Sequence, residues 1–415
     1  MWISSTALLA LSVLVWWSYS SYFGGSYSSL LVFRGDDGWC DSATQGFGLH
    51  CWGDYAALRF ESLFAPPSGP EALYPLGGRL IRLPFLITEM LFGSRAGVFV
   101  FLLACSASCL APLILISKGW NLAERNLLVM LFGLFSLGFM ASLDRGNTIA
   151  LTVSPLFLWC RELLRESKRA GLLTLYGVIL ILLKPQMFVF CLVYLSFRNK
   201  GQFIFPVLAP PVVLITTQML LGGGMGGVTS LITSAGSWSQ SLPSSAVYPT
   251  NLSVNKIAYV LGYDVWWIGY VVPVVPIIFI VIACWFGRQA PDSRDLITTT
   301  MCLTIFGQIS YVYYSVLTIV AVSLLGSMRD DGRNNAAGYY SRHSSNLVLI
   351  GVVALNAPLA IGNSWVGLSS LPASNMWSLV ALLLVSLGVV VHGVSRMLES
   401  GGFFFRRNRR IKMLT

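Results

Sequence analysis

Long apolar runs alternate with short polar segments along most of the chain. An α-helix of about 20 apolar residues crosses the ~30 Å hydrocarbon core of a bilayer. Runs of about this length recur from one end of the sequence to the other and predict about twelve transmembrane helices. The fold class that we expect is an all-α polytopic membrane protein. The expected spans are 2–23, 96–117, 126–143, 147–160, 170–184, 186–197, 203–221, 265–286, 295–308, 310–326, 345–361 and 376–395.

Composition supports a membrane protein and leaves no room for a large soluble domain. Hydrophobic residues make up 55% of the 415 residues and charged residues only 11%, whereas soluble domains carry about 25% charged residues. The first span has neither a basic leading region nor a cleavage site of small residues before or after it. We therefore expect it to be retained as a helix and not removed as a signal peptide.

The distribution of basic residues predicts the orientation of the chain. The net charge is +10, and most of the 27 Lys and Arg residues fall in alternate loops and in the C-terminal tail 396–415. Cytoplasmic loops are the basic ones in membrane proteins, so both termini are expected to be cytoplasmic, in a plasma membrane. The positive charge is then explained by topology and by attraction to anionic membrane lipids. No nucleic-acid partner is expected.

Two long segments, 24–95 and 222–264, are expected on the outer face of one integral membrane domain. Within the first, the sequence LGGRLIRLPFLITEMLF predicts an amphipathic helix in the membrane interface. Cys40 and Cys51 both lie in this segment, where they either form a disulfide or remain free thiols. The other six cysteines fall in or beside apolar runs and are expected to be small buried packing residues.

Asp54 is the acid that we single out in the first outer segment. It lies in HCWGDYAALRF, between a glycine and an apolar helical run. A carboxylate there can take a proton from an attacking hydroxyl, or it can cap the helix. His50 is either its neighbour in a site or a solvated loop residue. The acids of FRGDDGWCD either hold a divalent metal or form an acidic turn. These are Asp36, Asp37 and Asp41.

Several basic and polar groups are expected on the outer side, where basic residues are unusual. Arg79 and Arg82 share one side of the predicted interfacial helix. They either clamp a lipid phosphate or extend to the membrane surface. Lys184 ends an apolar run just before a proline that breaks the helix, so it either lines a cavity or anchors the interface. The turn with Arg145 and Asn147, and the mouth with Asn251 and Asn255, carry little alone.

Taken in order, these elements resemble glycosyltransferase family 87, a group of integral membrane enzymes with the GT-C fold. The resemblance runs from about residue 50 to residue 320. It is carried by GDYAAL, LYPLGGRLIRLPF, DRGNTIALTVSPLFLW, RAGLLTLYGVILILLKPQMFVF and TNLSVNKIAYVLG. The chain departs from the family in GQISYVYYSVLTIVAV, where tyrosines stand at positions that are usually histidine. The roles of those histidines therefore cannot be transferred.

The resemblance implies an inverting transfer of a sugar, mannose first, from a polyprenyl-phosphate donor to an outer-face glycolipid or cell-envelope glycan. Asp54 would be the general base, basic side chains would stabilise the departing phosphate, and no cofactor or metal would be needed. The substrate-binding residues that we expect are His50, Tyr55, Tyr74, Arg79, Arg82, Arg145, Asn147, Lys184, Gln186, Asn251, Tyr313 and Tyr314.

Other functions remain open at this point. A related enzyme could transfer arabinofuranose or glucose, or could polymerise a polysaccharide. A protein of another class could transport or flip a lipid-linked sugar. Transporters often show internal repeats and charged groups near the middle of the bilayer. The two halves of this chain show no convincing repeat, and its charged residues gather toward the outer interface, which favours an enzyme.

Overall fold

The computed structural model describes residues 76–134, 146–165, 168–188, 204–240, 253–260, 267–287, 291–307, 312–330 and 380–398, with a few short stretches between them. Every regular element in these residues is a helix, and they contain no strand. The protein is therefore an all-α membrane protein, as the apolar runs predict.

The helices follow one another with short connections. The α-helices are α4 (Leu76–Phe92), α5 (Ser94–Ile116), α6 (Leu122–Leu128), α8 (Ile149–Leu164), α9 (Ala170–Leu183), α11 (Ile204–Leu221), α12 (Met225–Gln240), α13 (Asn255–Val260), α14 (Ile268–Gly287), α15 (Ser293–Thr304) and α16 (Thr318–Asp330). The tighter and wider turns are η3 (Val129–Leu134), η4 (Pro185–Met187) and η6 (Val312–Leu317). A last helix covers Val380–Leu398 and is called the terminal helix below.

Four helices are long and apolar enough to cross a membrane. They are the segments Ala96–Ile116, Ile204–Leu221, Ile268–Trp285 and Val380–Leu398. Each coincides closely with one of the predicted spans. Prolines lie inside three of them, in α5, α11 and α14. Neighbouring helices and local turns commonly satisfy the backbone groups that a proline leaves open in a membrane helix.

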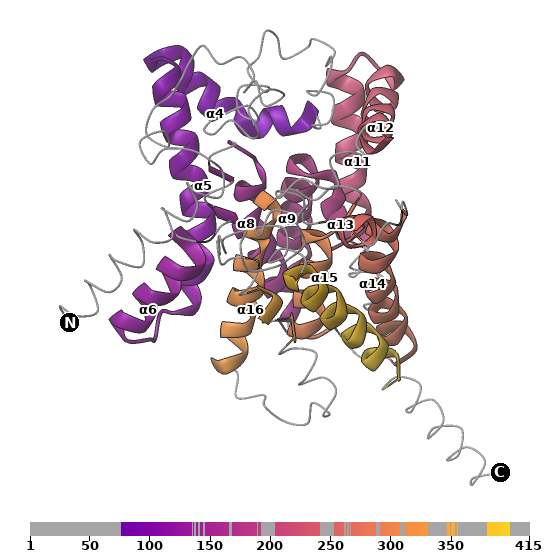
Figure 1. The fold of residues 1–415 in the computed structure, drawn as a ribbon. Helices are drawn as coiled ribbons and strands as arrows, with labels where there is room; N and C mark the ends of the chain where they lie inside the picture. Colours follow the sequence, from indigo (N-terminus) through magenta and orange to yellow (C-terminus); the bar gives the residue numbers. More distant parts are fainter. Residues whose placement is uncertain are drawn as a thin grey trace.

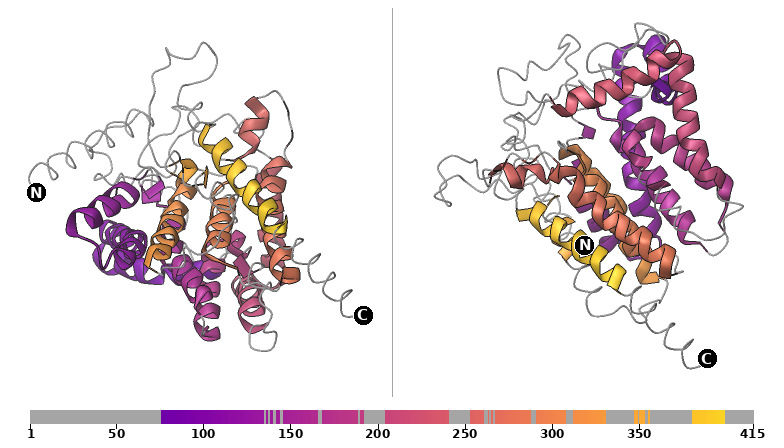
Figure 2. Two further views of the ribbon diagram at one scale, coloured as in Figure 1. Left: turned by 90° about the horizontal axis from the view of Figure 1, so that it is seen from below. Right: turned by 90° about the vertical axis from the view of Figure 1, so that its right-hand side faces the viewer.

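The helices form a bundle with a distinct cover at one end. In Figure 1, α5 and α14 lie on opposite sides, α8, α9 and α16 lie between them, and α4 lies across the top. Figure 2 shows the terminal helix, in yellow, on a face that includes α14. Buried apolar side chains of α5, α8, α15 and α16 make up most of the core. All six cysteines of the described residues are buried free thiols, as expected for packing residues.

The loop between α8 and α9 is fixed by Glu162, which is buried. Its carboxylate accepts hydrogen bonds from Nη1 of Arg165 at 2.8 Å and from Nη2 of Arg169 at 3.1 Å. It also accepts one from the backbone N–H of Arg169 at 2.9 Å. Burial alone would raise the pKa of Glu162, but these hydrogen bonds and the two guanidinium charges hold the pKa below its ordinary value. The basic α8–α9 loop therefore lies at one end of α9, and Lys184 lies at the other.

Close backbone contacts bring α4 onto the far end of α9. A Cβ atom on Gly78 would lie only 2.5 Å from the carbonyl oxygen of Leu182, so the two helices touch here without an intervening side chain. Gln218 of α11 accepts a hydrogen bond from the N–H of Leu76 at 2.9 Å and donates one to Gly227 O at 3.0 Å. The start of α4 is thus tied to α9, α11 and α12.

A second knot of polar contacts joins α13 to the start of α14. Asn255 Oδ1 accepts from the N–H of Gly269 at 2.6 Å, and Ser253 Oγ donates to Gly307 O at 2.5 Å. The N–H of Gly307 in turn donates to Gly269 O at 2.9 Å. Asn255 is therefore a structural link in this fold, because its amide oxygen closes the turn between two helices.

Candidate functional site

Lys184 stands where α9 breaks. The last helical residue is Leu183, Lys184 is extended with φ −150° and ψ 105°, and Pro185 opens the short turn η4. A proline strongly disfavours helical geometry in the residue before it, so this break follows from the sequence. The Lys184 side chain is only 6% exposed. The ammonium group is therefore held within the bundle, near the end of α9 that α4 covers.

Tyr314 meets this break from a distant part of the chain. It lies in η6, just before α16, and its side chain is partly buried. Lys184 Nζ lies over the Tyr314 ring, 5.7 Å from its centroid, and Gln186 Nε2 donates a hydrogen bond to the Tyr314 hydroxyl. A ring face attracts a cation at this distance. We call Lys184, Gln186 and Tyr314 the cation–tyrosine cluster.

The two α4 arginines lie near the same end of the bundle and are buried. Arg82 is 4% exposed, and Arg79 is also buried. Their positions on α4 bracket the turn after the Gly78–Leu182 contact, so they belong to the end of α9 that carries Lys184. Arg82 also acts electrostatically on Cys105 of α5. Buried positions argue against the alternative in which these arginines merely extend to the membrane surface.

Asn147 has an evident structural task. Its side-chain oxygen accepts a hydrogen bond from the N–H of Ile149 at 2.9 Å, at the start of α8, and the residue is buried. Its own N–H donates to Ser142 O at 2.9 Å, and Gly146 beside it has φ +63°. The predicted turn before α8 is present. The Asn147 side chain is used to begin the helix, since such oxygen acceptors satisfy helix-start N–H groups.

Part of the predicted site lies outside the described residues. This applies to the proposed base, to the possible Cys40–Cys51 pair and to the acids at 36, 37 and 41. It also applies to five of the predicted binding residues. For Tyr313 the structure describes the backbone of η6 but not the side chain. The residues concerned are His50, Asp54, Tyr55, Tyr74, Arg145 and Asn251.

Lys256 is a buried cation that the sequence pattern did not single out. It lies in α13, between two of the candidate membrane spans, and its side chain is fully buried. Burial lowers the pKa of Lys256 from its ordinary value of 10.5 to about 7, because a charge in a low-dielectric interior loses its hydration. The one sequence signal was a lysine placed directly before the apolar run IAYVLG.

The depressed pKa of Lys256 predicts how stability changes with pH. The folded state binds this proton less tightly than the unfolded state does, so folding is penalised below about pH 7. The penalty should fade as the pH rises from about 7 toward 10.5. We expect the thermal midpoint of the wild type in detergent to rise over this window relative to that of Lys256→Met. Parallel midpoints for the two proteins across the window would contradict the prediction.

The arrangement is suited to binding an anion at the edge of an apolar bundle. Three basic side chains, Arg79, Arg82 and Lys184, are buried close to the junction of α4 and α9. Charged side chains at membrane depth are costly and usually mark a ligand or ion pathway. Guanidinium and ammonium groups form strong charge-assisted hydrogen bonds with phosphate. The described residues contain no group of three or more His, Cys, Asp or Glu side chains placed to hold a metal.

Comparison with protein-family models, with curated protein sequences and with solved structures finds no significant match to this chain. The functional argument therefore rests on the residues and their geometry.

Proposed function

We propose that this protein is a membrane glycosyltransferase that moves a sugar, mannose first, from a polyprenyl-phosphate donor to an acceptor at the outer membrane face. The acceptor would be a glycolipid or a cell-envelope glycan. The observation that carries the proposal is the burial of Arg79, Arg82 and Lys184 around one helix end of an apolar bundle. A lipid-linked phosphate needs such a place, because its chain lies in lipid while its charge requires cations.

The chemistry assigns a role to each group. The acceptor hydroxyl oxygen attacks the anomeric carbon from the face opposite the phosphate, so configuration inverts. As the new bond forms, the hydroxyl proton passes to Asp54, and the bond from the anomeric carbon to the phosphate oxygen breaks. The phosphate leaves with that electron pair, and nearby cations stabilise its growing charge. Phosphate is a good leaving group, so a general acid is not required.

The cation–tyrosine cluster offers a way to hold one of these cations in place. Tyr314 supports the ammonium of Lys184 by its ring face, and Gln186 fixes the tyrosine hydroxyl. A pre-positioned cation stabilises charge without reorganising during the reaction. The tyrosine stands where histidines are usual in the family that the sequence resembles. The cluster therefore supports a donor site built with a different aromatic residue, and the donor sugar is left for experiment.

A transfer assay tests the proposal directly. Purified protein in nanodiscs would be incubated with radiolabelled polyprenyl-phosphate mannose, arabinofuranose or glucose and with a lipid extract as acceptor. We expect one label to move into a new glycolipid or glycan. A flippase would instead move an intact donor between leaflets without cleaving it. Donor translocation in proteoliposomes with no label transfer from any donor would overturn the enzyme and support the transporter.

A further inference from the structure

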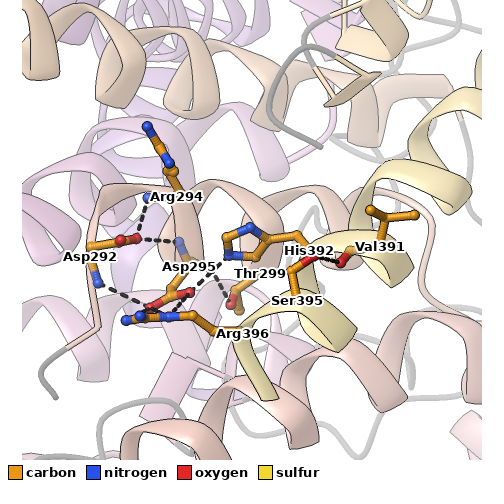
Figure 3. Close-up of polar contacts among 8 residues, drawn as sticks. All are labelled: Asp292, Arg294, Asp295, Thr299, Val391, His392, Ser395 and Arg396. Atoms are coloured by element: carbon orange, nitrogen blue, oxygen red, sulfur yellow. Dashed lines mark hydrogen bonds and ion pairs between the residues drawn. The ribbon is translucent and has the colours of Figure 1, made fainter. Parts of the chain in front are cut away.

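A buried charge network joins the terminal helix to α15, far from the cation–tyrosine cluster in the sequence. Asp295, in the first turn of α15, is fully buried. Arg396 donates to its carboxylate from Nε at 3.1 Å and from Nη2 at 2.9 Å, and His392 Nε2 lies 2.9 Å from Oδ1. Figure 3 shows the imidazole and the guanidinium converging on this one carboxylate from the terminal helix.

The acids around His392 outnumber the permanent cations that contact them. Asp292 caps α15: its Oδ1 accepts from the N–H of Asp295 at 3.0 Å, and its own N–H donates to Asp295 Oδ2 at 3.1 Å. The two carboxylates are thus adjacent, with Asp292 at the exposed rim. Arg294 points away from the network in Figure 3. With a neutral imidazole, two carboxylates share the one guanidinium of Arg396, and a protonated imidazole balances the set.

The other elements packed on the terminal helix bring little charge to this place. From α14, the thiol of Cys284 acts on Arg396. The described residues between 347 and 355 are apolar or glycine. The remaining contacts of the terminal helix are close apolar ones: a Cβ on Gly393 would lie 2.8 Å from Cα of Pro276, and one on Gly388 would lie 2.8 Å from Val348 Cγ2. Within the described residues, the network is therefore the main polar attachment of this helix.

We propose that His392, held against Asp295 beside Arg396, is a proton-binding site, and that its protonation strengthens the attachment of the terminal helix to α15. Two physical effects favour the proton in the packed state. The imidazolium faces a buried carboxylate at hydrogen-bond distance, and a charge-assisted hydrogen bond is about twice as strong as a neutral one. His392 also lies in the C-terminal part of its helix, where the helix dipole favours cations. Both effects are lost when the helix separates.

Histidine is suited to this role because its charge changes between about pH 5 and pH 8. By linkage, the state that binds the proton more tightly gains stability as the pH falls. Acidification should therefore tighten the contact between the terminal helix and α15, and alkalinisation should weaken it. The predicted topology places this network on the cytoplasmic side, so the pH sensed would be that of the cytoplasm.

Nitrogen NMR on the full-length protein with ¹⁵N-labelled histidine tests the site itself. The chain has only three histidines, and His392→Gln identifies the relevant signal. We expect this signal to change between neutral and protonated forms within about pH 5 to 8. Asp295→Asn should move the titration to lower pH by removing the counter-charge. Arg396→Gln should move it to higher pH by removing a like charge. A signal fixed in one form across the range overturns the proposal, as does a shift of the wrong sign.

Thermal unfolding tests the consequence for packing. The midpoint of the wild type should fall as the pH rises through the His392 titration, measured relative to that of His392→Gln. His343→Gln is the matched control, because it makes the same change elsewhere and should follow the wild type. The His392→Gln side chain keeps an N–H donor toward Asp295, so folding is expected to survive. Identical pH profiles for the wild type and His392→Gln would overturn the proposed strengthening even if the imidazole titrates.

Discussion

An Asp54→Asn variant is expected to lose sugar transfer by about 10²–10⁴-fold, the typical contribution of a general base. Asparagine keeps the shape of the side chain but cannot accept the proton of the acceptor hydroxyl. Expression and donor binding should change little, since no contact with the donor phosphate is assigned to this carboxylate. The measurement is initial transfer rate at saturating donor, together with donor affinity by titration.

Neighbouring acids provide the matched controls for Asp54. Asp36→Asn and Asp37→Asn make the same chemical change in the same outer segment, and they should leave the rate close to that of the wild type. A large loss at Asp36 or Asp37 that added divalent metal reverses would favour a metal site there. Ordinary turnover by Asp54→Asn would remove the proposed mechanism and leave the all-α membrane fold unaffected.

A Lys184→Met variant is expected to weaken donor binding by about 10- to 100-fold. Hydrogen bonds to charged groups contribute about 1.5–3 kcal/mol, and a factor of ten corresponds to about 1.4 kcal/mol. Methionine keeps an unbranched apolar stem at this buried position, so the packing at the end of α9 should be preserved. The check is equilibrium binding of the polyprenyl-phosphate sugar, with the thermal midpoint as a measure of folding.

Two further variants separate the charge from its support. Lys184→Arg keeps the positive charge and should bind the donor better than Lys184→Met does. Tyr314→Phe keeps the ring under the ammonium but removes the hydroxyl that accepts from Gln186, so only a small loss is expected. Normal donor affinity in Lys184→Met would place the phosphate elsewhere, and Arg79→Met and Arg82→Met would then be the next variants to examine.

Local features of the structure follow the sequence closely. The segment LGGRLIRLPFLITEMLF forms one helix, α4, over Leu76–Phe92, as its amphipathic pattern predicts. The apolar run before Lys184 ends as a helix at Leu183, where Pro185 requires the break. These results are accessible because hydrophobic period, length and proline position act within a few residues.

The predicted span 126–143 shows where local reasoning falls short. Its hydropathy suggests one continuous helix, but α6 ends at Leu128 and the chain continues as the wider turn η3 over Val129–Leu134. Gly138 then approaches η6 so closely that a Cβ atom would lie 2.2 Å from the N of Val316. Hydropathy reports whether a segment is apolar, and it does not report where packing against a distant turn changes the helical geometry.

The sequence by itself determined the all-α membrane class, the place of each helix named above and the break at Pro185, because these depend on neighbours along the chain. Only the tertiary structure decided which polar groups meet. Gln186 reaches Tyr314 across 128 residues, and Arg396 reaches Asp295 across 101. Likewise, the burial of Lys256 depends on how α13 is tied to α14. An apolar pattern shows that a helix face is buried, but many faces share that pattern, and side-chain fit and charge balance select the partner.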